Sequence, residues 1–138
     1  KYYFMDLGLR NARINFRQYE KSHLMENLIY NEMRVRGFNV DVGAVPIVNV
    51  KEDGKRQRST LEVDFVCNLG SRRYYIQSAY RMGTYEKVKQ ERASLLKVDD
   101  SFKKIIVIGE ECPVTRDEQG ITTISVYDFL LNENSLEL

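Results

Sequence analysis

Four apolar residues in a row, Ile105–Ile108, constrain the fold of this chain more than any other feature. The run lacks the alternation of polar and apolar side chains that is typical of a strand with one face in water. A short apolar run without alternation favours a strand that is covered on both faces, as in a sheet between helices. We therefore expect a layered α/β domain around this strand.

Two helices are expected in the rest of the chain. From Ser22, apolar side chains recur on one arc of a helix until Gly37, a residue typical of the position after a helix. Glu32 falls inside that apolar arc, so it needs a partner or access to solvent. Thr84 is expected to cap a second helix that ends near Val98.

The two ends of the chain carry weaker signals. The aromatic run of Lys1–Asp6 is interpreted as a strand that needs cover, and Asp6 as the cap of a short helix to about Asn11. A last helical turn is expected at Val126–Leu131. Since the chain does not begin with methionine, we expect it to be a piece, near the carboxyl end, of a longer polypeptide.

Five further segments favour strands, and turn residues separate them. They are residues 38–42 with 45–50, followed by a charged turn at 52–55, then 61–66, a turn at 68–71, 74–79 and 121–126. The order of the main elements is thus helix, three strands, helix, two strands and a short helix. This order predicts an antiparallel meander and then a crossover that returns the apolar strand to the same sheet.

Composition limits the domain count and the kinds of site. With 138 residues, 43% of them apolar and 30% charged, the chain is expected to form a single domain over residues 1–138. No apolar run is long enough to cross a hydrocarbon layer of about 30 Å and no signal peptide is recognisable, so we expect a cytoplasmic location and no membrane partner. Two cysteines, one histidine and the absence of a P-loop motif disfavour zinc, a histidine-based triad and nucleotide binding by this segment.

Charge is distributed unevenly along the sequence. Residues 1–104 contain 20 Lys and Arg against 13 Asp and Glu, whereas residues 105–138 contain one Arg against seven acidic residues. A charged partner could be steered to one end, although uneven exposure of charge is also common in proteins without such a partner.

Three oxygen-bearing side chains stand on elements that a meander and a covering helix would bring together. Glu26 lies early on the first helix, Asp64 on one strand, and Gln77 on the strand expected to pair with it. By alternation, Asp64 is expected on the face opposite Val63 and Phe65. Oxygen ligands of this kind suit Mg²⁺ or Mn²⁺, and phosphodiester hydrolysis needs such an ion. The trio predicts a metal site at the edge of a split sheet.

The same segments carry a resemblance to a known family. They are Met25–Glu32 with Arg36–Phe38, then Glu62–Val66, Tyr74–Ala79, Ser101–Val107 and the terminal Asp128–Asn132. Together they resemble the carboxy-terminal domain, of unknown function, of bacterial and archaeal AAA-type ATPases, over essentially the whole chain. That domain is similar in turn to the PD-(D/E)xK nuclease fold. The resemblance implies a restriction endonuclease-like α/β fold of three layers, with helices on both faces of a mixed sheet in the order α-β-β-β-α-β-β-α. It also implies an ATP-binding module elsewhere in the polypeptide.

The third element of the nuclease motif departs from the family pattern. Glu26 and Asp64 match the helix acid and the strand aspartate, but acid-any-lysine reads Gln77-Ser78-Ala79. Glutamine brings no negative charge, and alanine removes the ammonium that would stabilise the reacting phosphate. Losing one such group costs about 10²- to 10³-fold in rate. The departure favours a domain that has lost cleavage.

A basic residue from the following helix could reach back to the site and replace the missing lysine of the motif. Arg81, Lys87 and Lys89 lie within sequence range of the site, although solvated helix charges are the simpler explanation for them. For Asp64 the simpler alternative is a cross-strand pair with Arg72 or Arg73.

Nucleic-acid contacts are predicted from the same basic residues. Arg72 and Arg73 precede Tyr74 and Tyr75, and basic groups beside aromatic rings are typical of single-strand binding. One of the two tyrosines is expected in the core by alternation. The hairpin segment Lys55–Arg58 could also touch a phosphate backbone, or serve only solubility.

Three functions remain open at this point. The leading hypothesis is an inactive nuclease-like accessory domain that binds a partner, with DNA or RNA as the candidate, and regulates the ATPase module of its own polypeptide. The second is a divergent metal-dependent nuclease with a relocated lysine. The third is a protein-interaction module that uses the acidic end.

Overall fold

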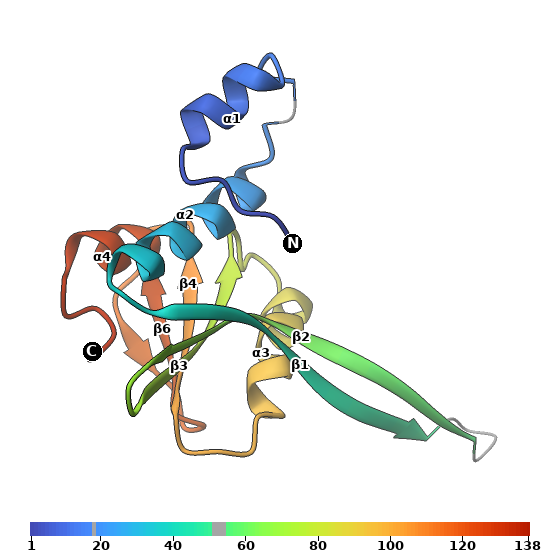
Figure 1. Cartoon of the computed structure of the whole chain (residues 1–138). Helices are drawn as coiled ribbons and strands as arrows, with labels where there is room; N and C mark the ends of the chain where they lie inside the picture. Colours follow the sequence, from blue (N-terminus) through green and yellow to red (C-terminus); the bar gives the residue numbers. More distant parts are fainter. Residues whose placement is uncertain (18, 51–54) are drawn as a thin grey trace.

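The computed structural model describes residues 1–17, 19–50 and 55–138 and contains one mixed sheet with helices on both sides (Figure 1). The six strands lie in the order β1-β2-β3-β4-β6-β5. Their bounds are β1 Asn39–Val50, β2 Arg56–Leu69, β3 Arg72–Ala79, β4 Lys103–Ile108, β5 Thr115–Arg116 and β6 Ile121–Ser125. The helices are α1 Leu7–Arg13, α2 Lys21–Val35, α3 Tyr85–Leu96 and α4 Val126–Leu131. The α/β class predicted from the sequence is confirmed.

The strand pairing follows the predicted meander and crossover. β1, β2 and β3 pair antiparallel, and α3 then carries the chain over the sheet to β4, which pairs parallel to β3. β6 lies parallel to β4, and the two-residue strand β5 closes that edge antiparallel to β6. The predicted turn at 52–54 lies outside the described residues. In the described part of the chain, no helix has both the length and the hydropathy to span a bilayer.

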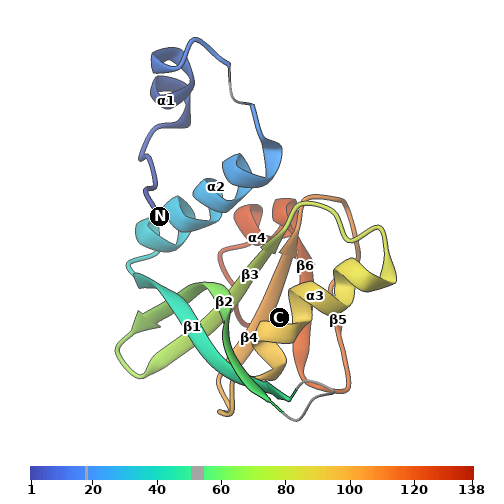
Figure 2. The ribbon, with the colours of Figure 1, turned by 90° about the vertical axis from the view of Figure 1, so that its right-hand side faces the viewer.

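The apolar strand β4 is covered on both faces, as its sequence predicts. Ile105 and Val107 belong to the core under α2 and α4, together with Ile29 and Phe129. Ile106 and Ile108 belong to a second core under α3, together with Leu95. Figure 2 shows α2 and α3 on opposite sides of the sheet. Complete burial of side chains on both faces explains the run without alternation.

The amino-terminal segment is not the strand that its aromatic run suggests. Residues 1–6 contain no strand and instead lie along α2. Asn27 accepts a hydrogen bond from the Phe4 N–H at 2.8 Å and donates one to the Phe4 carbonyl at 2.7 Å. A buried helix side chain thus makes the two bonds that a partner strand would make, which pattern alone does not reveal. The Asp6 side chain caps α1 by accepting from Leu9 N–H at 2.9 Å, as expected.

Strand β2 contains a bulge at the predicted site residue Asp64. Its register with β1 moves from Asp41↔Val66 to Gly43↔Val63, so two residues of β2 lie opposite one of β1. Consequently Val63 packs in the core under α3 while Phe65 packs under α2. The expectation that both share one face is wrong because the bulge interrupts the alternation. Gly43 faces this bulge, where a Cβ would lie 2.9 Å from the Val63 Cβ.

Glu32, which falls inside the apolar arc of α2, is satisfied by Arg36. The Arg36 Nε donates to Glu32 Oε1 at 2.7 Å, and the other guanidinium nitrogens donate to Ser135 Oγ at 2.8 Å and to the Phe129 carbonyl at 2.6 Å. One half-buried arginine therefore joins α2 to α4 and to the carboxy-terminal segment.

Arg36→Ala is expected to lower the free energy of unfolding by about 2 kcal/mol or more, because it leaves the half-buried Glu32 carboxylate without its donor. Urea unfolding measures the change. The matched control is Arg13→Ala, an exposed arginine on α1, which is expected to change stability by less than about 0.5 kcal/mol. Equal effects of the two substitutions would contradict this role of Arg36.

Candidate functional site

Strands β2 and β3 separate where the sequence places Asp64 and Gln77. Their backbones pair as far as Phe65↔Ile76, while β3 continues to pair with β4 through Ala79. Beyond Ile76, side chains replace the ladder: Ser78 N–H donates to Asp64 Oδ2 at 2.9 Å, and Asp64 N–H donates to Gln77 Oε1 at 3.3 Å. The bulge and these two bonds hold the sheet open at its centre.

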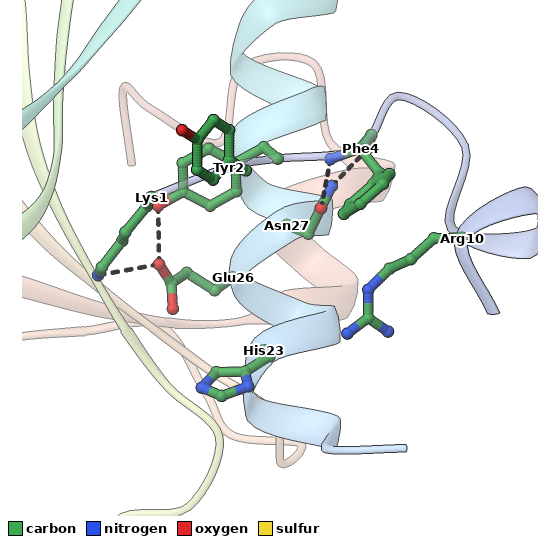
Figure 3. A pocket seen from close by; sticks show the side chains of 8 residues that line it. Lys1, Tyr2, Phe4, Arg10, His23, Glu26 and Asn27 are labelled. Carbon is green, nitrogen blue, oxygen red and sulfur yellow. Dashed lines mark hydrogen bonds and ion pairs between the residues drawn. The ribbon is translucent and has the colours of Figure 1, made fainter. Parts of the chain in front are cut away.

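An ammonium group lies between the carboxylates at this split. Lys1 Nζ is 3.0 Å from Glu26 Oε1 and 3.4 Å from Asp64 Oδ1, and it also contacts Glu62 Oε1. Figure 3 shows Lys1 reaching the Glu26 carboxylate of α2, and the Tyr3 hydroxyl donates to the same oxygen at 2.7 Å. The Glu26 and Asp64 side chains are only 16% and 13% exposed, whereas those of Lys1 and Glu62 are 36% and 51% exposed, so the cluster lies at the boundary between the interior and solvent.

The charges of the cluster shift its titration. Burial on its own would lower the pKa of Lys1, but hydrogen bonds to Glu62 and Glu26 raise that pKa well above its ordinary value. Burial raises the pKa of the Asp64 carboxyl; the Ser78 N–H and Lys1 oppose that rise, and the charge of Glu26 adds to it. Lys1 therefore stays positively charged near neutral pH, whereas burial makes the ionised form of Asp64 less favourable than it is in water.

The other side of the split is built by α3. Gln77 Nε2 donates to Glu91 Oε2 at 3.2 Å, and Ser94 Oγ lies 3.5 Å from Gln77 Oε1. The amide of Gln77 thus acts as donor toward Glu91 and as acceptor toward the backbone of Asp64. A glutamine fits both neighbours, whereas a glutamate would place a second carboxylate against Glu91.

The three residues predicted as metal ligands lie close together, but their oxygen atoms do not converge on one position. Glu26 and Asp64 both lie within 3.4 Å of the Lys1 nitrogen, while the Gln77 oxygen is turned to the Asp64 backbone. Among the described residues, no three His, Cys, Asp or Glu side chains are grouped so that they could hold a metal ion. In this arrangement the set does not fit Mg²⁺ or Mn²⁺, because an ammonium takes the position that a cation would need.

Sequence reasoning missed Lys1, Glu91 and Ser94. Lys1 reaches its partners across 25 and 63 residues of sequence, and no local pattern signals such a contact. Glu91 carries a weak signal, since it lies four residues after Lys87 on the same helix face and 4.0 Å from its ammonium. The alternative partners Arg72 and Arg73 do not pair with Asp64; Arg73 bonds Asn68 at 2.7 Å instead.

The five basic residues predicted to contact nucleic acid do not form one surface. Arg72 and Arg73 begin β3, so a whole strand separates them from Arg81, which lies 3.8 Å from Glu110. Lys87 faces Glu91, and Lys89 is exposed on α3. Of the three residues considered as a replacement for the motif lysine, only Lys87 therefore lies beside Glu91, the partner of Gln77.

Tyr74 and Tyr75 are both buried, and they lie on opposite faces of β3. Tyr74 packs under α2 and donates its hydroxyl to Glu137, and Tyr75 packs under α3 and donates to Asp100. The prediction that one of the two lies in the core is confirmed, and the second is buried as well because both faces of the sheet are covered. Burial, with the nearby Asp41 carboxylate, raises the pKa of the Cys67 thiol to about 12, so this buried cysteine packs as a small apolar side chain.

A cavity of about 250 Å³ adjoins the ion cluster on the side of α1. Its lining combines Lys1, Arg10 and His23 with the aromatic side chains of Tyr2 and Phe4 (Figure 3). The Phe4 ring is 48% exposed and the Arg10 guanidinium lies 6.0 Å from its centre. The rim of the cavity therefore carries the exposed rings of Tyr2 and Phe4 together with the guanidinium of Arg10. Arg10 is not part of the ion cluster of Lys1 and the carboxylates.

Comparison with known proteins gives a relative of moderate similarity. Over 131 residues the chain is 31% identical to a protein of Haemophilus influenzae (strain ATCC 51907 / DSM 11121 / KW20 / Rd) that is described as an uncharacterized protein. The match covers 95% of this chain but 28% of that protein, so the chain spans less than a third of its relative. No family model and no solved structure match the chain.

Gln77→Glu is expected to lower the free energy of unfolding by about 1–2 kcal/mol near pH 8 and by less near pH 5, since the new carboxylate faces Glu91 and one of the two must take up a proton. Unfolding by urea at several pH values measures this. Adding Glu91→Gln is expected to restore stability. A single variant as stable as the wild type at pH 8 would contradict the proposed role of the Gln77 amide.

Asp64→Asn tests the cost of the buried carboxylate. Folding raises the pKa of Asp64, so its contribution to stability is present below the ordinary carboxyl pKa and is lost as pH rises through the folded value. The stability of the wild type relative to Asp64→Asn should therefore fall as pH rises above the ordinary carboxyl pKa of about 4. Asp99→Asn, at an exposed position, is the control without such a trend. A difference that grows in favour of the wild type would reverse the assignment.

Proposed function

We propose that this chain is a nuclease-like domain that does not cleave, and that it binds nucleic acid as an accessory part of a larger ATPase. The observation that carries this proposal is the ammonium of Lys1 between Glu26 and Asp64, at 3.0 and 3.4 Å. The acids of a nuclease-type site are retained, but part of their charge is compensated by an ammonium of the protein itself.

The arrangement of the sheet supports the restriction endonuclease-like part of the proposal. A three-stranded meander, a crossover helix and a parallel strand surround a split at Asp64, with α2 on one face and α3 on the other. Bulges that redirect a side chain are frequent beside active sites. The resemblance of the motif segments to the nuclease fold points in the same direction.

Two substitutions in the third motif support the loss of cleavage. Ala79 is 2% exposed and packs in the core under α3, so the position of the motif lysine now serves the core. Gln77 is committed to Asp64 N–H and Glu91, and it brings no charge to the site. Each lost electrostatic group costs about 10²- to 10³-fold in the rate of a reaction that depends on it.

The length of the relative supports an accessory role. Only 28% of that protein corresponds to this chain, which leaves room for a further module that would bind ATP. We assign ATP to such a module, with the present domain as its partner in the same polypeptide.

Purified protein with Mg²⁺ or Mn²⁺ is expected to leave labelled single- and double-stranded DNA and RNA intact, and yet to bind them. Fluorescence anisotropy should show affinity that falls steeply between about 50 and 200 mM salt, because bound phosphates release counterions. Cleavage that Asp64→Ala abolishes would contradict the proposal. The absence of binding to any polynucleotide at low salt would also contradict it, and would favour a protein-interaction module.

A divergent metal-dependent nuclease is the second candidate, and one observation favours it. The motif lysine is absent from β3, but Lys1 brings an ammonium to the same carboxylates from another part of the chain. Its direct contact with them makes it a counter-ion rather than a group held ready for phosphate, and we therefore place this function second. The cleavage assay above separates the two.

A further inference from the structure

The hairpin of β1 and β2 extends beyond both hydrophobic cores. Its outer part, residues 45–50 paired with 56–61, is here called the arm, and it projects away from the helices and from the other strands (Figure 1). Beyond Val45, none of the described residues of the arm belongs to either core. With a rise of about 3.4 Å per residue, the arm is about 17 Å long. A ribbon without a core of its own offers both faces to a partner.

The two faces of the arm differ in exposure and in charge. Residues opposite each other in an antiparallel pair share a face, so the pairs Val48↔Arg58 and Pro46↔Thr60 lie on one side. The described side chains on that side, here called the arginine face, are all exposed: Pro46, Val48, Arg56, Arg58 and Thr60. On the other side, Val45, Ile47, Ser59 and Leu61 are half-buried, and the uncharged Asn49 and Gln57 farther out are exposed.

The two arginines of this face do not hold the described part of the protein together. Among the residues that the structure describes, neither Arg56 nor Arg58 has an ion-pair or hydrogen-bond partner for its side chain. By contrast, Arg36, Arg73 and Arg92 all bond to side chains of the same molecule. Arg56 and Arg58 are two residues apart on one strand, so their side chains leave the same face about 7 Å apart. With respect to the described residues, they are two unpaired guanidinium groups on an exposed ribbon.

The arginine face continues into the ion cluster. The β1–β2 register is unbroken from Val50↔Arg56 to Ala44↔Glu62, so Glu62 lies on the same face of β2 as Arg56 and Arg58. Glu62 contacts the ammonium of Lys1 at the split. The arginine face thus ends beside the candidate site.

We propose that the arm is a β-ribbon that binds duplex DNA, with Arg56 and Arg58 on phosphates. The major groove admits a two-stranded β-ribbon, and arginine matches phosphate geometry with paired donors. The residues of β1 on this face, Pro46 and Val48, are exposed and uncharged. No acidic side chain lies on the described part of this face of the arm. This inference rests on the proposed function, because it names where the nucleic acid binds.

The test compares variants of the whole chain of residues 1–138 in anisotropy titrations with a labelled duplex of about 20 base pairs, over about 50 to 200 mM salt. The double variant Arg56→Gln/Arg58→Gln should bind at least about tenfold more weakly at low salt, and its log–log salt slope should be smaller by about 2. Val48→Glu, which places a carboxylate opposite Arg58, should also weaken binding. The control Arg13→Gln/Lys97→Gln removes the same charge from exposed positions elsewhere and should leave the slope nearly unchanged.

The outcomes separate this inference from the proposed function. If the wild type binds duplex and the arm variants match the control, the arm assignment is overturned while nucleic-acid binding stands. If the wild type binds no polynucleotide, both are overturned. Capture of polyglutamate in place of DNA, with the same dependence on Arg56 and Arg58, would overturn the nucleic-acid assignment and make the arm a site for an acidic protein. Circular dichroism checks that every variant is folded.

Discussion

Two hydrogen bonds across the split, between Asp64 and the Gln77–Ser78 pair, are the interaction on which the rest of this structure depends. They replace the ladder where β2 leaves β3, so the strands can separate without leaving buried backbone groups unsatisfied. The bulge in β2 then turns Asp64 toward α2, while Gln77 stays under α3. Every feature of the candidate site follows from this one opening in the sheet.

A buried carboxylate at such an opening needs a counter-charge. Burial and the charge of Glu26 both raise the pKa of Asp64, and the ammonium of Lys1 opposes them. The same ammonium contacts Glu26 and Glu62, so one cation is shared by acids from a helix and a strand. Asn27 holds the adjacent backbone of Phe4, which fixes the segment that delivers the lysine. The amino-terminal segment is therefore part of the site.

Much of the fold could be predicted from local pattern, and the site only in part. The uninterrupted run in β4 predicts cover on both faces, and Thr84 caps α3 as expected because capping is a local interaction. The bulge is invisible in the sequence, since Val63 and Phe65 alternate as in a regular strand. Lys1 is invisible for another reason: its partners are distant in sequence, and only the folded chain brings them together. Glu26, Asp64 and Gln77 were found because each stands at a fixed place on a predicted element.

The central claim is that the protein's own ammonium takes the position of a cation at the split. The most direct measurement is a Mn²⁺ titration followed by paramagnetic broadening of the backbone amide signals of Asp64 and Ser78, in the wild type and in Lys1→Ala. The account predicts little broadening of these two signals in the wild type and clear broadening in the variant at the same Mn²⁺ concentrations. Strong broadening of both signals in the wild type, unchanged by removal of Lys1, would contradict it.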